Sequence, residues 1–284
     1  MKTKQLVFLL SILSIGLLPS CGKDNNEPNT DPEVETTFKL SENQAVSESI
    51  ADDANTVFFE AAASEGLAGF RTTQVVESTN TLSCGTVTVT PAVGFPKTIV
   101  INFGTGGCTS QDGVTRKGKI TIVLSDTVRH PGTTAVMTFD GYYVQGFKVE
   151  GTITWTNTST PNGLSWSREI SDGKITIPSG NYYWLHDGTT NVHQTGGAGT
   201  PLNLLDDVFS ITGNHTVTNP SNVSRTATVT EALEKKTTCI HVSKGKIKVE
   251  GPNHFAIIDY GDGTCDRVAT ISIDGNTPRT FLLP

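Results

Sequence analysis

Apolar and polar residues alternate through most of the chain after Thr72. Thr86 to Thr90 reads Thr-Val-Thr-Val-Thr, and similar alternation covers 119–124, 148–156 and 267–273. A period of two places one set of side chains on a buried face and the other in solvent, as in a half-buried β-strand. Dipeptides containing glycine separate many of these segments and predict tight turns. They include Asp112-Gly113, Asp140-Gly141, Asp172-Gly173, Asp187-Gly188 and Asp274-Gly275.

A helical period is confined to residues 41–63. Ser41 is suited to cap the start of this helix, and Gly66 and Gly69 are suited to end it. We predict that this helix packs on a face or an edge of the sheet. Its apolar residues fall near one side, with acidic residues opposite: Ala45, Ile50, Ala54, Val57, Phe58 and Ala61.

The predicted fold class is mainly β, either an antiparallel β-sandwich or a long twisted meander sheet, with the N-terminal helix packed on it. Turns spaced this closely exclude βαβ crossovers, which need helices between the strands. A Gly-rich segment at 195–201 is the nearest candidate for a domain boundary. Cysteine-containing segments lie on both sides of it, so we expect 41–284 to form a single domain.

Two of these segments resemble each other. Residues 100–108 (VINFGTGGC) and 257–265 (IIDYGDGTC) share an apolar pair, Asn or Asp, an aromatic residue, two glycines and a cysteine. Four cysteines outside the N-terminal region allow three connectivities. A hairpin folded at 251–253 would place Cys239 opposite Cys265, and the turn after Pro91 would do the same, in a looser register, for Cys84 and Cys108. The turns therefore favour the disulfides Cys84–Cys108 and Cys239–Cys265.

The N-terminus resembles a bacterial lipoprotein signal. Lys2 and Lys4 precede an apolar run at 6–18, and Ser20-Cys21 follows. We expect a signal peptide at 1–20, a lipid on Cys21 (palmitate among its chains) and a flexible acidic tether over 21–40. The lipid anchor is then the only contact with the membrane. Cleavage before Cys21 leaves 19 basic and 28 acidic residues, a net charge of 19 − 28 = −9, which argues against a nucleic-acid partner.

The signal, the helix and the paired cysteine segments ending in NFGTGGC and DYGDGTCD resemble an uncharacterised group of Bacteroidota lipoproteins. That resemblance implies no activity and no site residues. Lys23-Asp24 also resembles the short charged signals that direct such lipoproteins outward. We therefore expect lipid anchoring in the outer membrane, with cell-surface exposure and a periplasm-facing position as the two alternatives.

The densest aromatic stretch is 181–187. On a strand, Tyr182, Trp184 and His186 would share one face, and Trp155 would extend it. If that face lies in solvent, it forms a platform on which sugar rings stack. The competing interpretation, aromatic residues filling the core, is favoured because aromatic side chains dominate core burial.

A second candidate site is a calcium loop formed by Asp259, Asp262 and Asp266. Asp before Gly is ordinary turn chemistry, so a structural turn is favoured and no metal or cofactor is expected. No catalytic motif is present, and carboxylates for a hydrolase cannot be identified from the sequence. The leading hypothesis is a non-enzymatic lipoprotein at the outer membrane or cell surface with a structural or adhesive role. A glycan-binding module is second and a hydrolase third, with a glycan or a protein as the partner.

Overall fold

The computed structural model describes residues 31–69, 80–160, 163–200 and 204–284. Asp31–Pro284 forms one compact unit. The predicted signal peptide, Cys21 and the first part of the tether lie outside the described residues. Among the helices of the described chain, none combines the length and apolar character needed to span a membrane.

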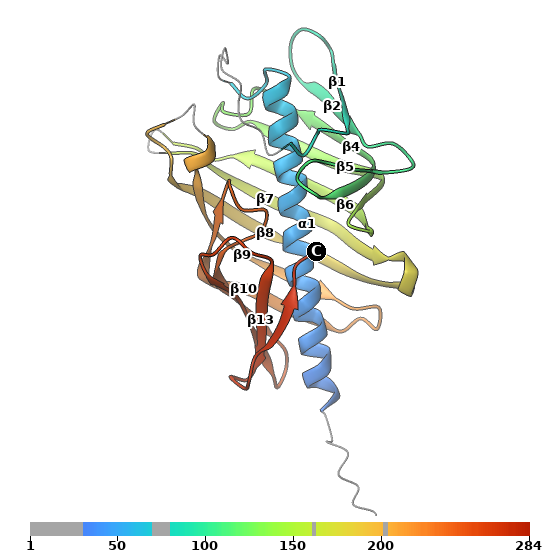
Figure 1. Ribbon diagram of the computed structural model, residues 1–284, viewed down its shortest axis with the longest axis vertical. Coiled ribbons are helices and arrows are strands. Elements are labelled where there is room, and N and C mark those ends of the chain that lie inside the picture. The colour runs from blue at the N-terminus through green and yellow to red at the C-terminus, as the bar shows by residue number, and fades with distance from the viewer. Residues whose placement is uncertain (1–30, 70–79, 161–162, 201–203) are drawn as a thin grey trace, which may run out of the picture. The chain divides into compact units, whose positions relative to one another are not determined.

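The described chain forms one long helix and a single antiparallel sheet of 14 strands (Figure 1). The strands lie side by side in chain order, except that β3 pairs only with β4. This confirms a mainly β fold, in the form of a long meander sheet with one N-terminal helix. The elements are α1 (Pro32–Ser64), β1 (Thr86–Thr90), β2 (Lys97–Asn102), β3 (Cys108–Thr109), β4 (Thr115–Leu124), β5 (Thr134–Val144), β6 (Phe147–Asn157), β7 (Ser165–Ile177), η1 (Pro178–Gly180), β8 (Tyr182–Gly196), η2 (Leu204–Asp206), β9 (Val208–Thr218), β10 (Ser224–Lys236), β11 (Lys244–Glu250), β12 (Phe255–Asp262), β13 (Val268–Ile273) and β14 (Arg279–Leu282).

Helix α1 begins earlier than predicted. The carboxylate of Asp31 accepts a hydrogen bond from the Glu33 backbone N–H at 2.8 Å, and Pro32 occupies the first turn. Residues 32–40 are therefore helical and not part of a flexible tether. Ser41 does not cap the helix; it is buried inside it, where its hydroxyl donates to the carbonyl of Thr37 at 2.7 Å. The predicted helix start was wrong because Thr37, Ser41 and Gln44 are polar but buried. Their polar character hid the helical pattern at the start of α1.

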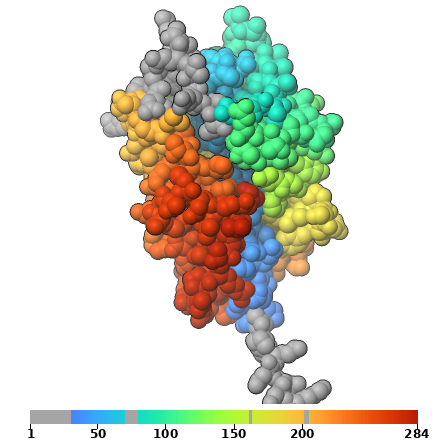
Figure 2. Space-filling model, viewed as in Figure 1, coloured from blue at the N-terminus to red at the C-terminus, as the bar shows by residue number. Residues whose placement is uncertain are grey.

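The sheet curls around α1, which crosses the strands (Figure 1). In the space-filling view, the lower part of the helix is visible as a band between the C-terminal strands and the central strands (Figure 2). The helix is consequently buried on more than one side. Leu40, Val57 and Phe58 are fully buried, and so is Gln44. A helix in this position has no single apolar stripe.

A row of glycines crosses the sheet where it bends. Asp140-Gly141, Asp172-Gly173 and Asp187-Gly188 lie inside strands, at or beside shifts in register, and are not the turns that we predicted. At Gly118, φ is +82° and an added Cβ would lie 2.1 Å from the carbonyl oxygen of Gly141. Glycine at such a position allows a β-bulge and a sharp bend between closely spaced strands. The row comprises Gly118, Gly141, Gly151, Gly173, Gly188, Gly213 and Gly245.

Two disulfides fasten the segments that carry the repeated sequence. Cys84 is bonded to Cys108 with a Cα–Cα distance of 6.1 Å, and Cys239 is bonded to Cys265 with a distance of 5.1 Å. This is the connectivity that the turn positions favoured. Each bond closes a loop that is short in sequence, so it stabilises a local hairpin more than the packing of the whole sheet.

We expect Gly118→Ala to lower the free energy of unfolding by at least about 2 kcal/mol, because the methyl group meets a backbone carbonyl at a positive φ. Gly106→Ala is the matched control: nothing lies within 4 Å of its Cβ position, and it should change stability by less than about 0.5 kcal/mol. Urea denaturation of both variants measures the difference. Equal effects would contradict the proposed close packing at Gly118.

Candidate ligand cavity

A cavity of about 1050 Å³ lies between the C-terminal half of α1 and the sheet. Residues between 49 and 64 of the helix form one wall, and β6 to β9 contribute to the opposite wall. Most of the large side chains that line it are apolar. They include Ile50, Phe59, Val87, Val114, Val128, Trp155, Leu164, Trp166, Val192, Phe209, Ile211 and Ile240.

An aromatic cluster forms part of this wall. Phe59 of α1 contacts Trp155 and Trp166 edge to face, with ring centroids 5.6 and 5.2 Å apart. Trp166 in turn meets Phe209 of β9 at 5.1 Å. The alternation of β6, β7 and β9 places these residues on the inner face of the sheet, where they meet the helix. Aromatic pairs in this geometry form a rigid, apolar surface.

Among the described residues that line the cavity, four polar atoms are buried without a hydrogen-bond partner. They are the indole Nε1 atoms of Trp155 and Trp166, the Oδ1 atom of Asn55 and the Oδ2 atom of Asp52, the last of which lies 3.0 Å from the ammonium group of Lys235. Buried polar groups in folded proteins are nearly always hydrogen-bonded, because an unpaired group carries a desolvation cost. In the described part of the chain, the two indole N–H groups therefore lie beneath the aromatic wall and carry a desolvation cost there.

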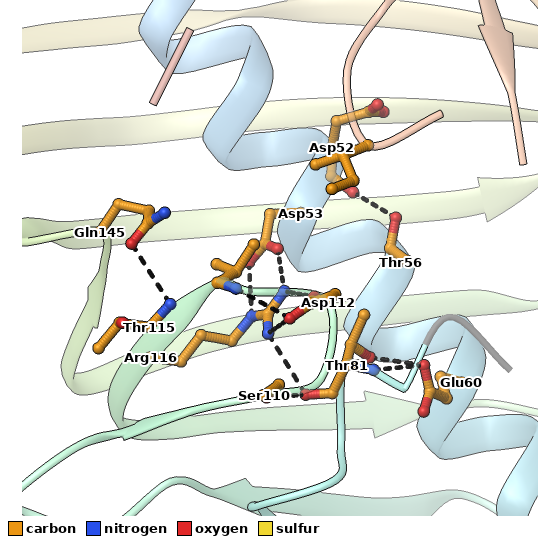
Figure 3. Close-up of polar contacts among 12 residues, drawn as sticks. Asp52, Asp53, Thr56, Glu60, Thr81, Ser110, Asp112, Thr115, Arg116 and Gln145 are labelled. Carbon is orange, nitrogen blue, oxygen red and sulfur yellow. Dashed lines mark hydrogen bonds and ion pairs between the residues drawn. The ribbon is translucent and has the colours of Figure 1, made fainter. Parts of the chain in front are cut away.

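One polar side of the cavity is built around Arg116. Its guanidinium lies between Asp53 of α1 and Asp112 of the loop before β4 (Figure 3). The Asp112 carboxylate is 2.8 Å from the guanidinium, and the Nε–H of Arg116 donates to Asp53 at 3.0 Å. Burial by itself would lower the pKa of Arg116, but the hydrogen bonds and charge of Asp53 outweigh it and raise that pKa.

A second ion-pair network joins the middle of α1 to the sheet. Arg168 of β7, which is 1% exposed, donates to the carboxylates of Glu48 and Asp52. Lys235 of β10 contacts Asp52 at 3.0 Å. Burial acts to raise the pKa of Asp52, but Lys235 and then Arg168 reverse the effect and hold that pKa below its ordinary value. Glu48, Asp52 and Asp53 of α1 are thus all paired with cations of the sheet.

Asp207, on the cavity wall before β9, is in a different environment. Its carboxylate accepts a hydrogen bond from the amide of Gln194 at 2.7 Å. Burial, followed by the neighbouring charge of Asp206, raises the pKa of Asp207 to about 6. This carboxyl group therefore changes charge in mildly acidic conditions.

Two buried histidines and one half-buried histidine have pKa values below the usual range. The rings of His186 and His215 stack with centroids 4.7 Å apart. Burial first, and then the other histidine, lowers the pKa of His186 well below its usual value, and burial also lowers the pKa of His215. His241 lines the cavity, and burial together with Lys235 lowers its pKa to about 4.

The predicted aromatic platform does not face solvent. Tyr182, Trp184 and His186 do share one face, but that face points toward α1. The Trp184 indole donates to the Ser47 hydroxyl at 2.8 Å, and the Tyr182 hydroxyl accepts from the amide of Asn43 at 2.9 Å. Trp155 and Trp184 are each 1% exposed and His186 is 2% exposed, so none of the three offers a surface for stacking a sugar in solvent.

The three carboxylates of the candidate calcium loop are used in local turns. Asp259 accepts from the Gly261 N–H at 2.9 Å, Asp262 from the Thr264 N–H at 3.1 Å and Asp266 from the Val268 N–H at 2.8 Å. Each carboxylate bonds the backbone two residues ahead, as in an Asx-turn. In the part of the chain that the structure describes, no group of three or more His, Cys, Asp or Glu side chains is placed to hold a metal ion.

The sequence analysis missed the inward-facing arginines. Arg116 and Arg168 occupy buried positions in the alternating pattern of β4 and β7, where an apolar residue is usual. A charged residue in the apolar phase of a strand is the signal that would have identified them. It predicts a buried partner of opposite charge, and the acidic residues of 48–53 were the available partners.

Comparison of the chain with family models, with curated proteins and with solved structures gives no match. The resemblance to Bacteroidota lipoproteins therefore remains a prediction. What can be argued about function comes from the cavity and from the charges and exposed side chains around it.

We expect Arg168→Met to lower the free energy of unfolding by about 3–5 kcal/mol, because Glu48 and Asp52 would remain buried without their shared cation. Lys248→Met, which breaks the exposed pair with Glu250, should cost less than about 1 kcal/mol. Urea denaturation measures both. Adding Glu48→Gln to Arg168→Met should restore part of the lost stability. If Arg168→Met costs as little as Lys248→Met, Arg168 is not the essential partner of Glu48 and Asp52.

The buried histidines also predict acid sensitivity. Below pH 6.5 the unfolded chain protonates His186, His215 and His241 while the folded chain does not, so each lowers stability by up to about 1.4 kcal/mol per pH unit. Asp207 acts in the opposite direction between 3.8 and about 6, because there the folded state holds the proton. The three histidines outweigh Asp207 and His254, whose raised pKa values act in the opposite direction, so stability should fall as pH drops from 6.5 toward 4.

His186→Phe should reduce this acid-induced loss, since it removes one of the three groups while keeping a stacked ring against His215. His254→Gln is the control: the pKa of His254 is raised by Asp274, so its stabilising effect is present below pH 6.5 and is lost as pH rises. Urea midpoints of the parent and both variants at several pH values between about 5 and 7 test whether His186→Phe reduces the acid-induced loss of stability. Parallel pH profiles for His186→Phe and the parent would refute it.

Proposed function

We propose that this protein is a non-enzymatic, lipid-anchored lipoprotein of the outer membrane that binds an apolar ligand with a hydrogen-bonding group, such as an acyl-chain amphiphile. The observation that carries the ligand is the cavity of about 1050 Å³ between α1 and the sheet. Binding sites for small molecules are concave, mostly apolar and typically about 300–1000 Å³ in volume. The cavity is at the upper end of this range, which suits a long or branched ligand.

The chemistry of the wall favours the same class. Phe59, Trp155, Trp166 and Phe209 provide apolar contact area without charge. The polar side chains among the lining residues, such as Thr56, Ser165 and Asp207, favour a ligand that also carries a hydrogen-bonding group.

The proposed location is supported by the sequence and by the disulfides. The basic start, the apolar run and Cys21 match a lipoprotein signal. The two disulfides are compatible with folding outside the cytoplasm, because such bonds persist in oxidising compartments. A lipid on Cys21 would hold the protein at a membrane, close to acyl-chain ligands.

The alternatives have less support. Glycan stacking loses its platform, because Trp155, Trp184 and His186 are buried against α1. For a hydrolase, Asp52 and Asp53 of the cavity wall are engaged in ion pairs with Lys235 and Arg116. Asp207, whose pKa is raised to about 6, is held by a hydrogen bond from Gln194. A structural or adhesive role through the outer face of the sheet is compatible with ligand binding and stays a prediction.

The cavity is tested with the fragment 31–284 and a fluorescent fatty acid such as dansyl-undecanoic acid. We expect saturable binding that Val192→Trp weakens at least fivefold, because the larger side chain fills part of the cavity from β8. Val123→Trp is the matched control, since Val123 is 44% exposed and lies outside the cavity wall. Binding that is absent in the parent, or equal in all three proteins, would rule out the cavity as the site.

A further inference from the structure

The loop that joins β1 to β2 is apolar throughout. Its sequence, residues 91–96, is Pro-Ala-Val-Gly-Phe-Pro, and every one of the six residues is exposed. Val93 is 87% exposed and Phe95 is 38% exposed. The other loops between the described strands all contain at least one polar side chain. Single exposed apolar residues are normal in soluble proteins, but a contiguous exposed group marks a contact surface.

The polar backbone of this loop is partly satisfied from inside. The ammonium group of Lys97, a buried residue, donates to the carbonyl of Pro91 at 2.7 Å and to that of Ala92 at 3.1 Å. The same group lies 5.6 Å from the centre of the Phe95 ring. Pro91 and Pro96 have no backbone N–H to satisfy. Each of these features lowers the cost of moving the loop from water into an apolar phase.

We infer that the 91–96 loop contacts a lipid bilayer by inserting Val93 and Phe95 into its interfacial region. The loop protrudes past the end of the strands as a narrow tip (Figure 1). A protruding tip without charged or hydrogen-bonding side chains offers little for specific protein recognition, whereas a lipid interface requires only apolar area and satisfied polar groups. This contact is distinct from the proposed lipid on Cys21 and does not depend on ligand binding in the cavity.

The charge of Lys97 and the net charge of the chain decide which type of lipid the loop should contact. Lys97, the cation that directly follows the loop, is occupied by backbone carbonyls, and the chain carries a net charge of −7, which the predicted cleavage before Cys21 would change to 19 − 28 = −9. Attraction to anionic lipids therefore cannot supply the binding. The contact should form on uncharged phosphatidylcholine vesicles and should resist salt, because apolar insertion is not screened.

The test is sedimentation of fragment 31–284 with phosphatidylcholine vesicles. This fragment holds the complete helix, sheet and disulfides and lacks Cys21, so the lipid anchor does not contribute. The double variant V93S/F95S should partition at least tenfold more weakly than the parent. The control V268S/L282S removes two apolar residues that are 41% and 59% exposed and paired on the other edge of the sheet, and it should bind as the parent does.

Val93→Trp adds a direct readout: its emission should shift to the blue when vesicles are added, and the shift should persist from about 0.05 to about 0.5 M salt. Three results would overturn the inference. They are no vesicle binding by the parent, equal loss in both double variants, and binding that salt abolishes. Self-association of the parent that V93S/F95S removes, without vesicle binding, would instead assign the loop to contact with a second copy. Fatty-acid binding is measured on the same variants. A variant that loses vesicle binding but still binds the fatty acid has lost the loop contact and not the cavity.

Discussion

The structure depends on charge pairing between a buried helix and the sheet around it. Arg116, Arg168 and Arg225 project inward from β4, β7 and β10, three strands apart in each case. They meet successive parts of α1. Arg116 pairs with Asp53 and Arg168 with Glu48 and Asp52, whereas Arg225 donates to the Thr37 hydroxyl at 3.0 Å. Since an unpaired buried charge costs several kcal/mol, neither the helix nor the concave face of the sheet is stable without the other.

The bend of the sheet follows from the same requirement. A sheet can surround a helix only if its strands curve. The row of glycines from Gly118 to Gly245 provides positions where, except at Gly141, neighbouring strands approach too closely for a side chain. Where the sheet has curved but α1 does not fill the space, a cavity remains. The candidate ligand site is thus a consequence of the fold and needs no separate lid or added domain.

The parts that the sequence predicted are those set by local pattern. Alternation identified the strands, and the turn positions led to Cys84–Cys108 and Cys239–Cys265. The parts that it missed are set by tertiary contacts. Asp172-Gly173 has the composition of a turn, but it lies within β7 because neighbouring strands continue on both sides. The face shared by Trp184 and His186 was identified correctly, yet its burial depended on α1, which no local signal places there.

For the candidate site, sequence alone gave neither the cavity nor its ionic wall. The residues that line the cavity lie on a helix, on seven strands and on several loops, so they have no common spacing in the chain. Buried arginines in the apolar phase of β4 and β7 were visible as exceptions to the pattern. Such exceptions are informative, since a sheet accepts a charge on its inner face only where a partner is already fixed.

The two proposed functions share one strand. Val87 of β1 lines the cavity, and the same strand ends at Thr90, directly before the apolar loop. Three residues of extended strand rise only about 10 Å, which is shorter than a typical acyl chain. A bilayer contact at 91–96 would therefore hold the cavity wall within reach of a lipid molecule leaving the membrane. A chain with a net charge of −7 needs an apolar element for such an approach, because its net charge gives no attraction to anionic lipid surfaces.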